Sequence, residues 1–229
     1  DGHGVQSATG IGLCPIVAKL DPTTLATVWG KLYDGKSQGA IATKIAISPS
    51  GEVYFTGSFA CPGMNFGGPL LVNNSTLSFL YIVKVSNATG DYAGWQVQAI
   101  DTGLSSRGKS LPGTDVFNNP LGSIRFDSSG SFYVCGEFTK TLSISGSVIV
   151  EKVFADGTEM FVVKYNSAGL FQWITQFSGT PSTYQYGHAL GMGVSQEGPF
   201  VTGIFSGTFD FSGGKSLSPG SEFLVKLAR

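Results

Sequence analysis

Apolar and polar residues alternate along most of this chain in short runs, which are separated by polar turns that contain glycine. A period of two is typical of a β-strand with one buried face, and glycine supplies the positive φ that tight turns need. Three segments repeat one such hairpin: residues 42–59, 121–138 and 189–205. The second run of each hairpin ends at a glycine: Gly57, Gly136 and Gly203.

A second kind of hairpin interleaves with the first. Its copies are residues 15–32, 80–100 and 160–177, and residues 222–229 hold its first strand alone. One lysine recurs in these copies at intervals of about 62 to 80 residues: Lys19, Lys84, Lys164 and Lys226. A tryptophan follows it in the three longer copies: Trp29, Trp95 and Trp173. We expect the tryptophans to fill the space between neighbouring sheets and the lysines to lie on the polar side of their strands.

Two hairpins per repeat make a four-stranded antiparallel sheet, which must cover both of its faces with neighbours. The pattern therefore predicts an all-β chain, a β-propeller-type array of four-stranded antiparallel blades that is incomplete, with about three blades' worth of strands. Residues 1–229 form one propeller segment, divided into an N-terminal tail (1–12), a partial blade (13–33), two blades (41–100 and 120–177) and a last partial blade (187–229). Long loops are expected at 60–78, 101–119 and 139–158. Such a segment cannot close a ring alone, so either the chain is a fragment or partners complete the ring.

Residues 206–228, SGTFDFSGGKSLSPGSEFLVKLA, resemble the repeat unit of secreted and surface proteins of the SBBP type (beta-propeller repeat). Residues 59–72 and 138–149 look like degraded copies of the same element, and VYFTGSF at 53–59 is similar to the family's V-Y-V-T-G-x-F hairpin. The resemblance implies a propeller and an extracellular setting. It implies no reaction and provides no catalytic residues.

Composition narrows the function classes. The 229 residues carry a formal net charge of -1, with 13% charged and 12% aromatic residues. This balance offers no basic face for nucleic acid, and it does not suit disorder. No apolar stretch approaches the roughly 18 to 20 residues of a membrane span, so none is expected. The sequence starts at Asp1 without a leader, which suggests a removed signal peptide or one segment of a longer protein.

Covalent modification is expected at two kinds of residue. Asn73, Asn74 and Asn87 each begin an N-x-S/T triplet in or beside an expected turn and are candidates for N-glycosylation. Cys14 and Cys61 flank strand ends and could form a disulfide, whereas Cys135 lies within a strand and is expected to be a buried thiol. Glycosylation and a disulfide both fit a secreted or cell-surface protein.

Two motifs that carry catalysis elsewhere lack their context here. Residues 103–110 match the phosphate-binding pattern G-x-x-x-x-G-K-S, but Pro112 and Gly113 prevent the helix that this pattern requires. Residues 35–39 match G-x-S-x-G but lead into a strand rather than a helix. The acidic residues fall mostly in expected turns: Asp21, Glu52, Asp127 and Glu197. We therefore expect no enzyme, no catalytic residues, no metal site and no cofactor.

These observations favour a non-catalytic extracellular structural, adhesive or assembly module, whose partners are other protein chains or further blades of the same protein. Glycans are a further partner class. One alternative is a carbohydrate- or ligand-binding propeller that uses aromatic residues in its loops: Tyr92, Phe117, Tyr184 and Tyr186. A less favoured alternative is a fragment of a quinoprotein-type dehydrogenase, because residues 86–95 (SNATGDYAGW) resemble a blade element of those enzymes.

Overall fold

The computed structural model describes residues 14–33, 40–59, 61–72, 77–105, 121–139, 141–144, 148–151, 157–179, 186–211, 216–218, 220 and 222–227. Within these residues the chain forms strands and turns and no helix, so the all-β prediction is confirmed. All strand pairs are antiparallel. We name the main sheets in chain order, from the first to the fourth.

The first sheet contains β1 (Ile16–Leu20) and β2 (Thr27–Leu32). The second contains β3 (Ala40–Ile47), β4 (Val53–Phe59), β7 (Leu77–Val85), β8 (Tyr92–Ser105), β11 (Thr141–Ile144) and β12 (Val148–Glu151). The third contains β9 (Leu121–Phe126), β10 (Phe132–Phe138), β13 (Glu159–Tyr165), β14 (Phe171–Gly179), β17 (Phe209–Asp210) and β18 (Ser216–Leu217). The fourth contains β15 (Gly187–Ser195), β16 (Gly198–Phe205) and β19 (Glu222–Lys226), and a small separate sheet contains β5 (Gly63–Met64) and β6 (Leu71–Val72).

The two predicted kinds of hairpin are confirmed. The first kind forms β3–β4, β9–β10 and β15–β16, and the second forms β1–β2, β7–β8 and β13–β14. Pairing of β4 with β7 and of β10 with β13 joins the two kinds into one sheet. The second and third sheets therefore each contain the four-stranded order expected from the repeat.

The segments 60–78 and 139–158, which were expected to be loops, each contain a pair of short strands, so this prediction was wrong in part. The first contains β5 and β6, and the second contains β11 and β12. β11 lies in sequence between two strands of the third sheet, yet it pairs with β8 of the second sheet. Likewise β17, which follows a strand of the fourth sheet, pairs with β14 of the third. β8 and β14 would otherwise present unpaired backbone groups, so these short hairpins cover two sheet edges. Of the third expected loop, 101–119, residues 101–105 continue β8 and the rest lies outside the described residues.

In two of the first-kind hairpins, the glycine near the end of the second strand is required sterically. Gly57 lies opposite Tyr81 of β7, and Gly203 lies opposite Phe223 of β19. A Cβ on Gly57 would overlap the carbonyl oxygen of Ile41 and the ring of Tyr81, whose hydroxyl donates a 2.7 Å hydrogen bond to that same carbonyl. A β-bulge in the neighbouring strand accompanies each glycine. An aromatic ring laid over a glycine is a known way to fix strand register.

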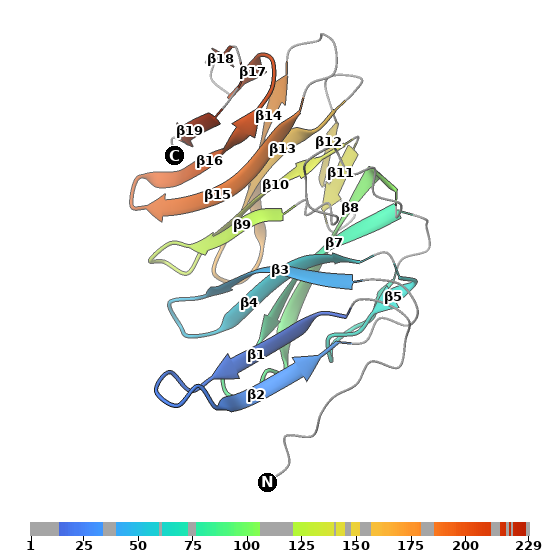
Figure 1. The fold of residues 1–229 in the computed structure, drawn as a ribbon, viewed down its shortest axis with the longest axis vertical. Helices are drawn as coiled ribbons and strands as arrows, with labels where there is room; N and C mark the ends of the chain where they lie inside the picture. Colours follow the sequence, from blue (N-terminus) through green and yellow to red (C-terminus); the bar gives the residue numbers. More distant parts are fainter. Residues whose placement is uncertain are drawn as a thin grey trace.

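Successive sheets pack face to face, and Figure 1 shows them following one another from the first sheet at one end of the molecule to the fourth at the other. Three hydrophobic cores lie between them. Representative members are Val17, Trp29, Phe55 and Tyr81 in the first core, Ile82, Trp95, Phe132 and Phe161 in the second, and Val162, Trp173, Val201 and Phe223 in the third. The prediction that each tryptophan packs between neighbouring sheets is confirmed.

The cores distinguish the two faces of each sheet. On β13, Phe161 contributes to the second core, whereas the adjacent Val162 contributes to the third, because successive side chains of a strand point to opposite faces. We call the face that looks toward the next sheet in the chain the forward face, and the opposite one the rear face. Tyr81, Phe161 and Phe223 occupy equivalent rear positions, and Val17, Ile82 and Val162 occupy equivalent forward positions.

Candidate functional site

The glycosylation candidate Asn87 lies in the turn between β7 and β8, where its backbone has a structural role. Its carbonyl oxygen accepts hydrogen bonds from the indole Nε1 of Trp29 (2.9 Å) and from Nζ of Lys19 (3.2 Å). In the next pair of sheets, the Trp95 indole donates in the same way to the carbonyl of Gly169 (3.1 Å). Trp29 and Trp95 therefore each join their own sheet to a turn of the next sheet. Asn73 and Asn74 lie outside the described residues, and glycosylation of all three stays a prediction.

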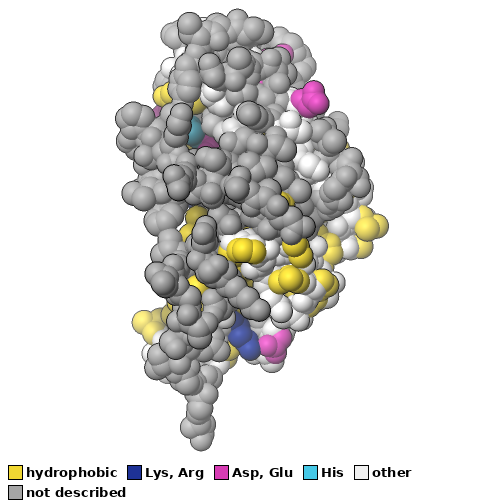
Figure 2. Space-filling model, turned by 90° about the vertical axis from the view of Figure 1, so that its right-hand side faces the viewer, with side chains coloured by type: hydrophobic (Ala, Val, Ile, Leu, Met, Phe, Trp, Pro, Cys, Tyr) yellow, Lys and Arg dark blue, Asp and Glu magenta, His cyan; other side chains and the backbone are white. Residues whose placement is uncertain are grey.

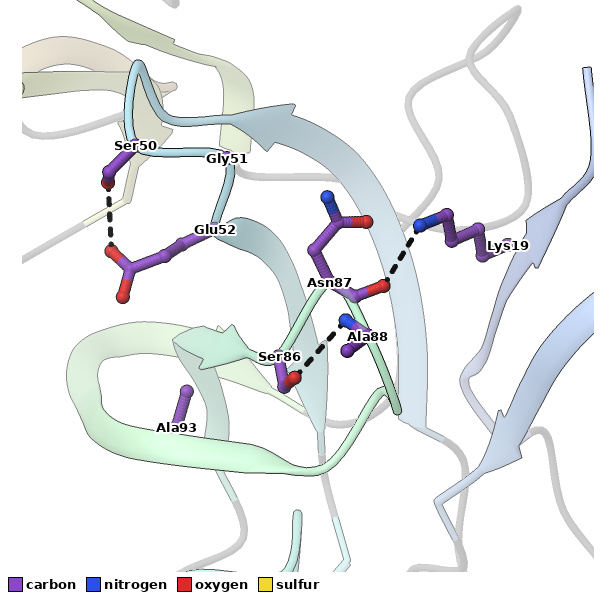
Figure 3. A pocket seen from close by; sticks show the side chains of 8 residues that line it. All are labelled: Lys19, Ser50, Gly51, Glu52, Ser86, Asn87, Ala88 and Ala93. Carbon is purple, nitrogen blue, oxygen red and sulfur yellow. Dashed lines mark hydrogen bonds between the residues drawn. The ribbon is translucent and has the colours of Figure 1, made fainter.

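A shallow pocket of about 470 Å³ surrounds this turn (Figure 3). Its lining residues come from three neighbouring segments: Lys19, Ser50, Gly51, Glu52, Ser86, Asn87, Ala88 and Ala93. The charged groups of the pocket already have protein partners, since Lys19 bonds to Asn87 and Glu52 forms an ion pair with Lys84. Ser50 donates to Glu52 as well, at 3.3 Å. The pocket thus offers a ligand few polar groups that are not already engaged.

The cysteines are thiols in the structure and, within the described residues, no disulfide joins them. Cys61 is buried in the first core, where its thiol donates to the carbonyl of Gly63 (3.3 Å), and Cys14 is partly buried. A bridge between Cys14 and Cys61 stays a prediction for the protein in an oxidising compartment. Cys135 is buried in the third core, as expected, and burial raises the pKa of its thiol to about 12. A thiol that stays protonated at neutral pH is a poor nucleophile.

The acidic residues that were expected in turns are found there, and they accept hydrogen bonds. Asp21 accepts from the backbone nitrogens of Thr23 (3.0 Å) and Thr24 (2.7 Å), and these bonds, chiefly the one from Thr24, lower the pKa of its carboxyl. Asp127 accepts similarly from the backbone nitrogens of Ser129 (2.9 Å) and Ser131 (3.1 Å). These carboxylates stabilise turns rather than face one another across a cleft.

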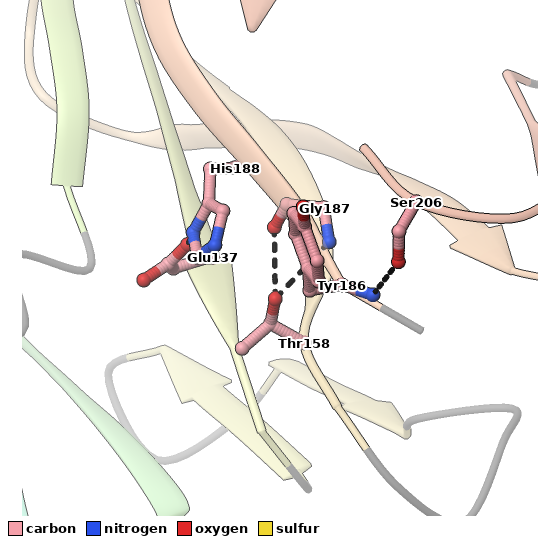
Figure 4. Close-up of polar contacts among 6 residues, drawn as sticks. All are labelled: Glu137, Thr158, Tyr186, Gly187, His188 and Ser206. Atoms are coloured by element: carbon pink, nitrogen blue, oxygen red, sulfur yellow. Dashed lines mark hydrogen bonds and ion pairs between the residues drawn. The ribbon is translucent and has the colours of Figure 1, made fainter. Parts of the chain in front are cut away.

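One polar cluster was missed by the sequence analysis. Nδ1 of His188 in β15 is hydrogen-bonded to the carboxyl group of Glu137 in β10, and both side chains are largely buried between the third and fourth sheets (Figure 4). Beside them, Thr158 Oγ1 donates to the carbonyl of Gly187 (3.0 Å) and accepts from its nitrogen (3.1 Å). The only sequence signal is a glutamate inside a strand at an otherwise uncharged position, which predicts a partner without identifying it. This cluster joins two sheets.

Two of the four aromatic residues proposed for sugar binding, Tyr92 and Tyr186, lie against other parts of the protein. Tyr92 packs against the first core and lies over Gly67 and Gly68, and the ring of Tyr186 lies 5.3 Å from that of His188. Phe117 and Tyr184 lie outside the described residues, as does the G-x-S-x-G match at 35–39. Among the described residues, no group of three His, Cys, Asp or Glu side chains is placed to hold a metal ion.

Apolar side chains are exposed at the two ends of the sheet stack, as they also are on β3, where Ile45 and Ile47 are exposed. On the rear face of the first sheet, Ile16 is 67% exposed, and Leu20 and Val28 are also exposed. On the forward face of the fourth sheet, Leu224 is 71% exposed and Thr202 beside it is exposed as well. Figure 2 shows in addition that hydrophobic side chains gather in the lower half of one side of the molecule, the half that holds the first and second sheets. Exposed apolar patches of this kind commonly mark interaction sites.

Comparison with known proteins does not assign the chain to a family. No model of a known protein family matches the sequence, and no curated protein matches it either. The resemblance to SBBP-type repeats therefore stays a prediction. In the described part of the chain, no helix has the length and apolar character needed to cross a membrane.

Proposed function

We propose that this chain is a non-catalytic extracellular structural or assembly module built from β-propeller-type repeats. The observation that carries the proposal is the pair of exposed apolar end faces, Ile16 and Leu20 on one side and Leu224 on the other. The equivalent residues in the other sheets are buried against a neighbour. A sheet that leaves apolar residues exposed where the equivalent residues of its neighbours are buried is suited to further packing.

A propeller-type arrangement is supported by the position of the first strand in each sheet. β9 lies beside both β3 and β15, so the first strands of three successive sheets lie next to one another. Blades in a propeller are arranged in this way around a common axis. The sequence repeat and the resemblance to SBBP-type units support the same arrangement, and the sequons support a secreted or cell-surface location.

The alternatives have less support. A carbohydrate-binding propeller would need aromatic faces beside free polar groups, whereas Tyr92 and Tyr186 pack on protein and the pocket at Asn87 has its charges paired. The segment 86–95, which suggested a quinoprotein-type fragment, provides the turn carbonyl that Trp29 and Lys19 bind. That role is structural.

Isolation of the protein from its source tests the proposal. The chain should be recovered in a particle of defined stoichiometry, as measured by native mass spectrometry and quantitative peptide counting, with no turnover on glycoside, ester, peptide or redox-dye substrates. Absorbance in the near ultraviolet and visible should show no quinone chromophore. A monomer that turns over any of these substrates would refute the proposal.

A further inference from the structure

The two end faces are not alike, because they are opposite faces of the same repeat. The first sheet covers its forward residue Val17 and exposes its rear residue Ile16. The fourth sheet covers its rear residue Phe223 and exposes its forward residue Leu224. One end of the molecule is therefore a rear face without a preceding sheet, and the other is a forward face without a following sheet, in the part of the chain that the structure describes.

We infer that these two faces bind each other between copies of the chain, so that the fourth sheet of one copy packs head to tail on the first sheet of a second copy. This inference rests on the proposed function and names the partner. Each of the three cores inside the molecule joins a forward face to a rear face. The intermolecular contact would repeat that arrangement a further time.

The forward face of the fourth sheet shares one feature, a lysine over an aromatic ring, with a forward face that is already covered. In the third sheet, Lys164 lies over the ring of Tyr133 at 5.1 Å, and Tyr133 is buried beneath the fourth sheet. In the fourth sheet, the equivalent Lys226 lies over the ring of Phe200 at 5.7 Å, and Leu224 beside it is exposed. The same side-chain arrangement is thus present where the covering sheet is absent from the described residues.

The rear face of the first sheet has the matching character. Ile16, Ala18 and Leu20 occupy the positions in β1 that Phe161, Val163 and Tyr165 fill in β13 of the third sheet. Ala18 pairs with Gly30, and a Cβ on Gly30 would lie 4.0 Å from that of Ala18, so the middle of this face carries small groups only. The large Leu224 side chain of another copy would meet these small residues. Apolar side chains of unequal size on facing surfaces pack well.

The contact is heterologous, because it joins two different surfaces. The first and fourth sheets lie at opposite ends of one molecule (Figure 1), so a second copy rather than the same copy is the partner. A heterologous contact gives a closed ring where its rotation closes and an open filament where it does not.

Two charge substitutions test the inference: Ile16→Glu on the rear face and Leu224→Glu on the forward face. Both residues are exposed, so each variant should keep the wild-type circular dichroism spectrum and unfolding temperature. Sedimentation velocity over a range of concentrations should show oligomers for the wild type, and a dissociation constant raised at least roughly tenfold in each variant. The matched control is Leu170→Glu, a 63%-exposed leucine in the β13–β14 turn, which should associate as the wild type does.

The decisive sample is an equimolar mixture of the two variants. Each variant retains the face that the other has lost, so the mixture should form a one-to-one complex that grows no further. Association that persists in one variant alone would indicate like faces binding each other and would overturn the inference, as would a wild type that stays monomeric. A monomeric wild type found in a stoichiometric particle with other proteins would leave the proposed function intact, whereas turnover by an associating chain would refute the proposed function alone.

Discussion

The strands β13, β1 and β19 are equivalent in the repeat and have similar sequences, yet they differ in how many of their faces are buried. β13 in the third sheet is buried on both faces, so Phe161 (2% exposed) and Val162 (0% exposed) both contribute to cores. β1 and β19 share one alternating burial pattern, but relative to the repeated lysine it is shifted by one residue. β1 therefore exposes the face that β19 buries. The difference lies in the neighbouring sheets, which leave Ile16 uncovered at one end and Leu224 uncovered at the other.

The largest expected effect contrasts an interior position with its equivalent at the end. Phe161→Ala would leave a cavity in the second core and should lower the free energy of unfolding by about 3–5 kcal/mol. Ile16→Ala at the equivalent position should change it by less than about 0.5 kcal/mol, since Ile16 is exposed. Urea unfolding at concentrations where the chain is monomeric measures both values. Similar losses in the two variants would show that the first sheet is covered in solution and would remove the contrast.

The second largest loss of stability should be similar in the second sheet and in the fourth sheet. Gly57 in the second sheet and Gly203 in the fourth are both enclosed by strands of their own sheet, so a Cβ at either would overlap a carbonyl and an aromatic ring. We expect Gly57→Ala and Gly203→Ala each to cost about 1–3 kcal/mol. Substitution of Gly203 should therefore lower the free energy of unfolding although this residue belongs to an end sheet, whereas substitution of Ile16 should not.

Gly193→Ala is the control for this pair, because nothing lies within 4 Å of a Cβ at that position. Its free energy of unfolding should stay within about 0.5 kcal/mol of the wild type. If Gly203→Ala were as mild as Gly193→Ala, the bulge and the ring of Phe223 would not be rigid in the last sheet. The fourth sheet would then differ from the second in its internal order as well as in its neighbours.

The sequence predicts features that are local to one sheet, but it does not predict contacts that depend on which segment lies next to that sheet. Alternation around Gly57 and Gly203 predicts the hairpins, and the recurring tryptophans predict packing between sheets. The pairing of β11 with β8 could not be predicted, because it depends on an open edge some 40 residues earlier in the chain. The pair Glu137 and His188 is separated by 51 residues and has no equivalent in the other repeats.

The end faces, which carry the proposed function, are the hardest case for sequence reasoning. Val162 and Leu224 are both apolar residues two positions before the repeated lysine. Apart from Glu222, which stands where the other segment has Met160, the two segments do not indicate that Val162 is covered and Leu224 exposed. The position of each sheet in the stack decides which of the two residues is covered. The proposed interaction surface is therefore distinguished only by the different burial of equivalent residues in different sheets.

The smallest expected effect uses pH to compare two cores without changing their packing. Burial, assisted by the charge of Asp91, raises the pKa of Tyr33 in the first core to about 12, and burial, assisted by Glu52, raises that of Tyr54 in the second core to about 12. An unfolded tyrosine has a pKa of 10.0, so the stabilisation from keeping these phenols neutral is fully present below pH 10 and is lost as the pH rises toward 12. The free energy of unfolding should thus fall over this range more steeply in the wild type than in Tyr54→Phe, which lacks one such group.

Phenolate absorbance followed during the same titration should appear together with unfolding. Equal slopes for the two proteins, with phenolate formed while the sheets remain folded, would mean that the second core admits water at Tyr54 and is less tightly closed than the burial of its neighbours Phe132 and Ile82 indicates.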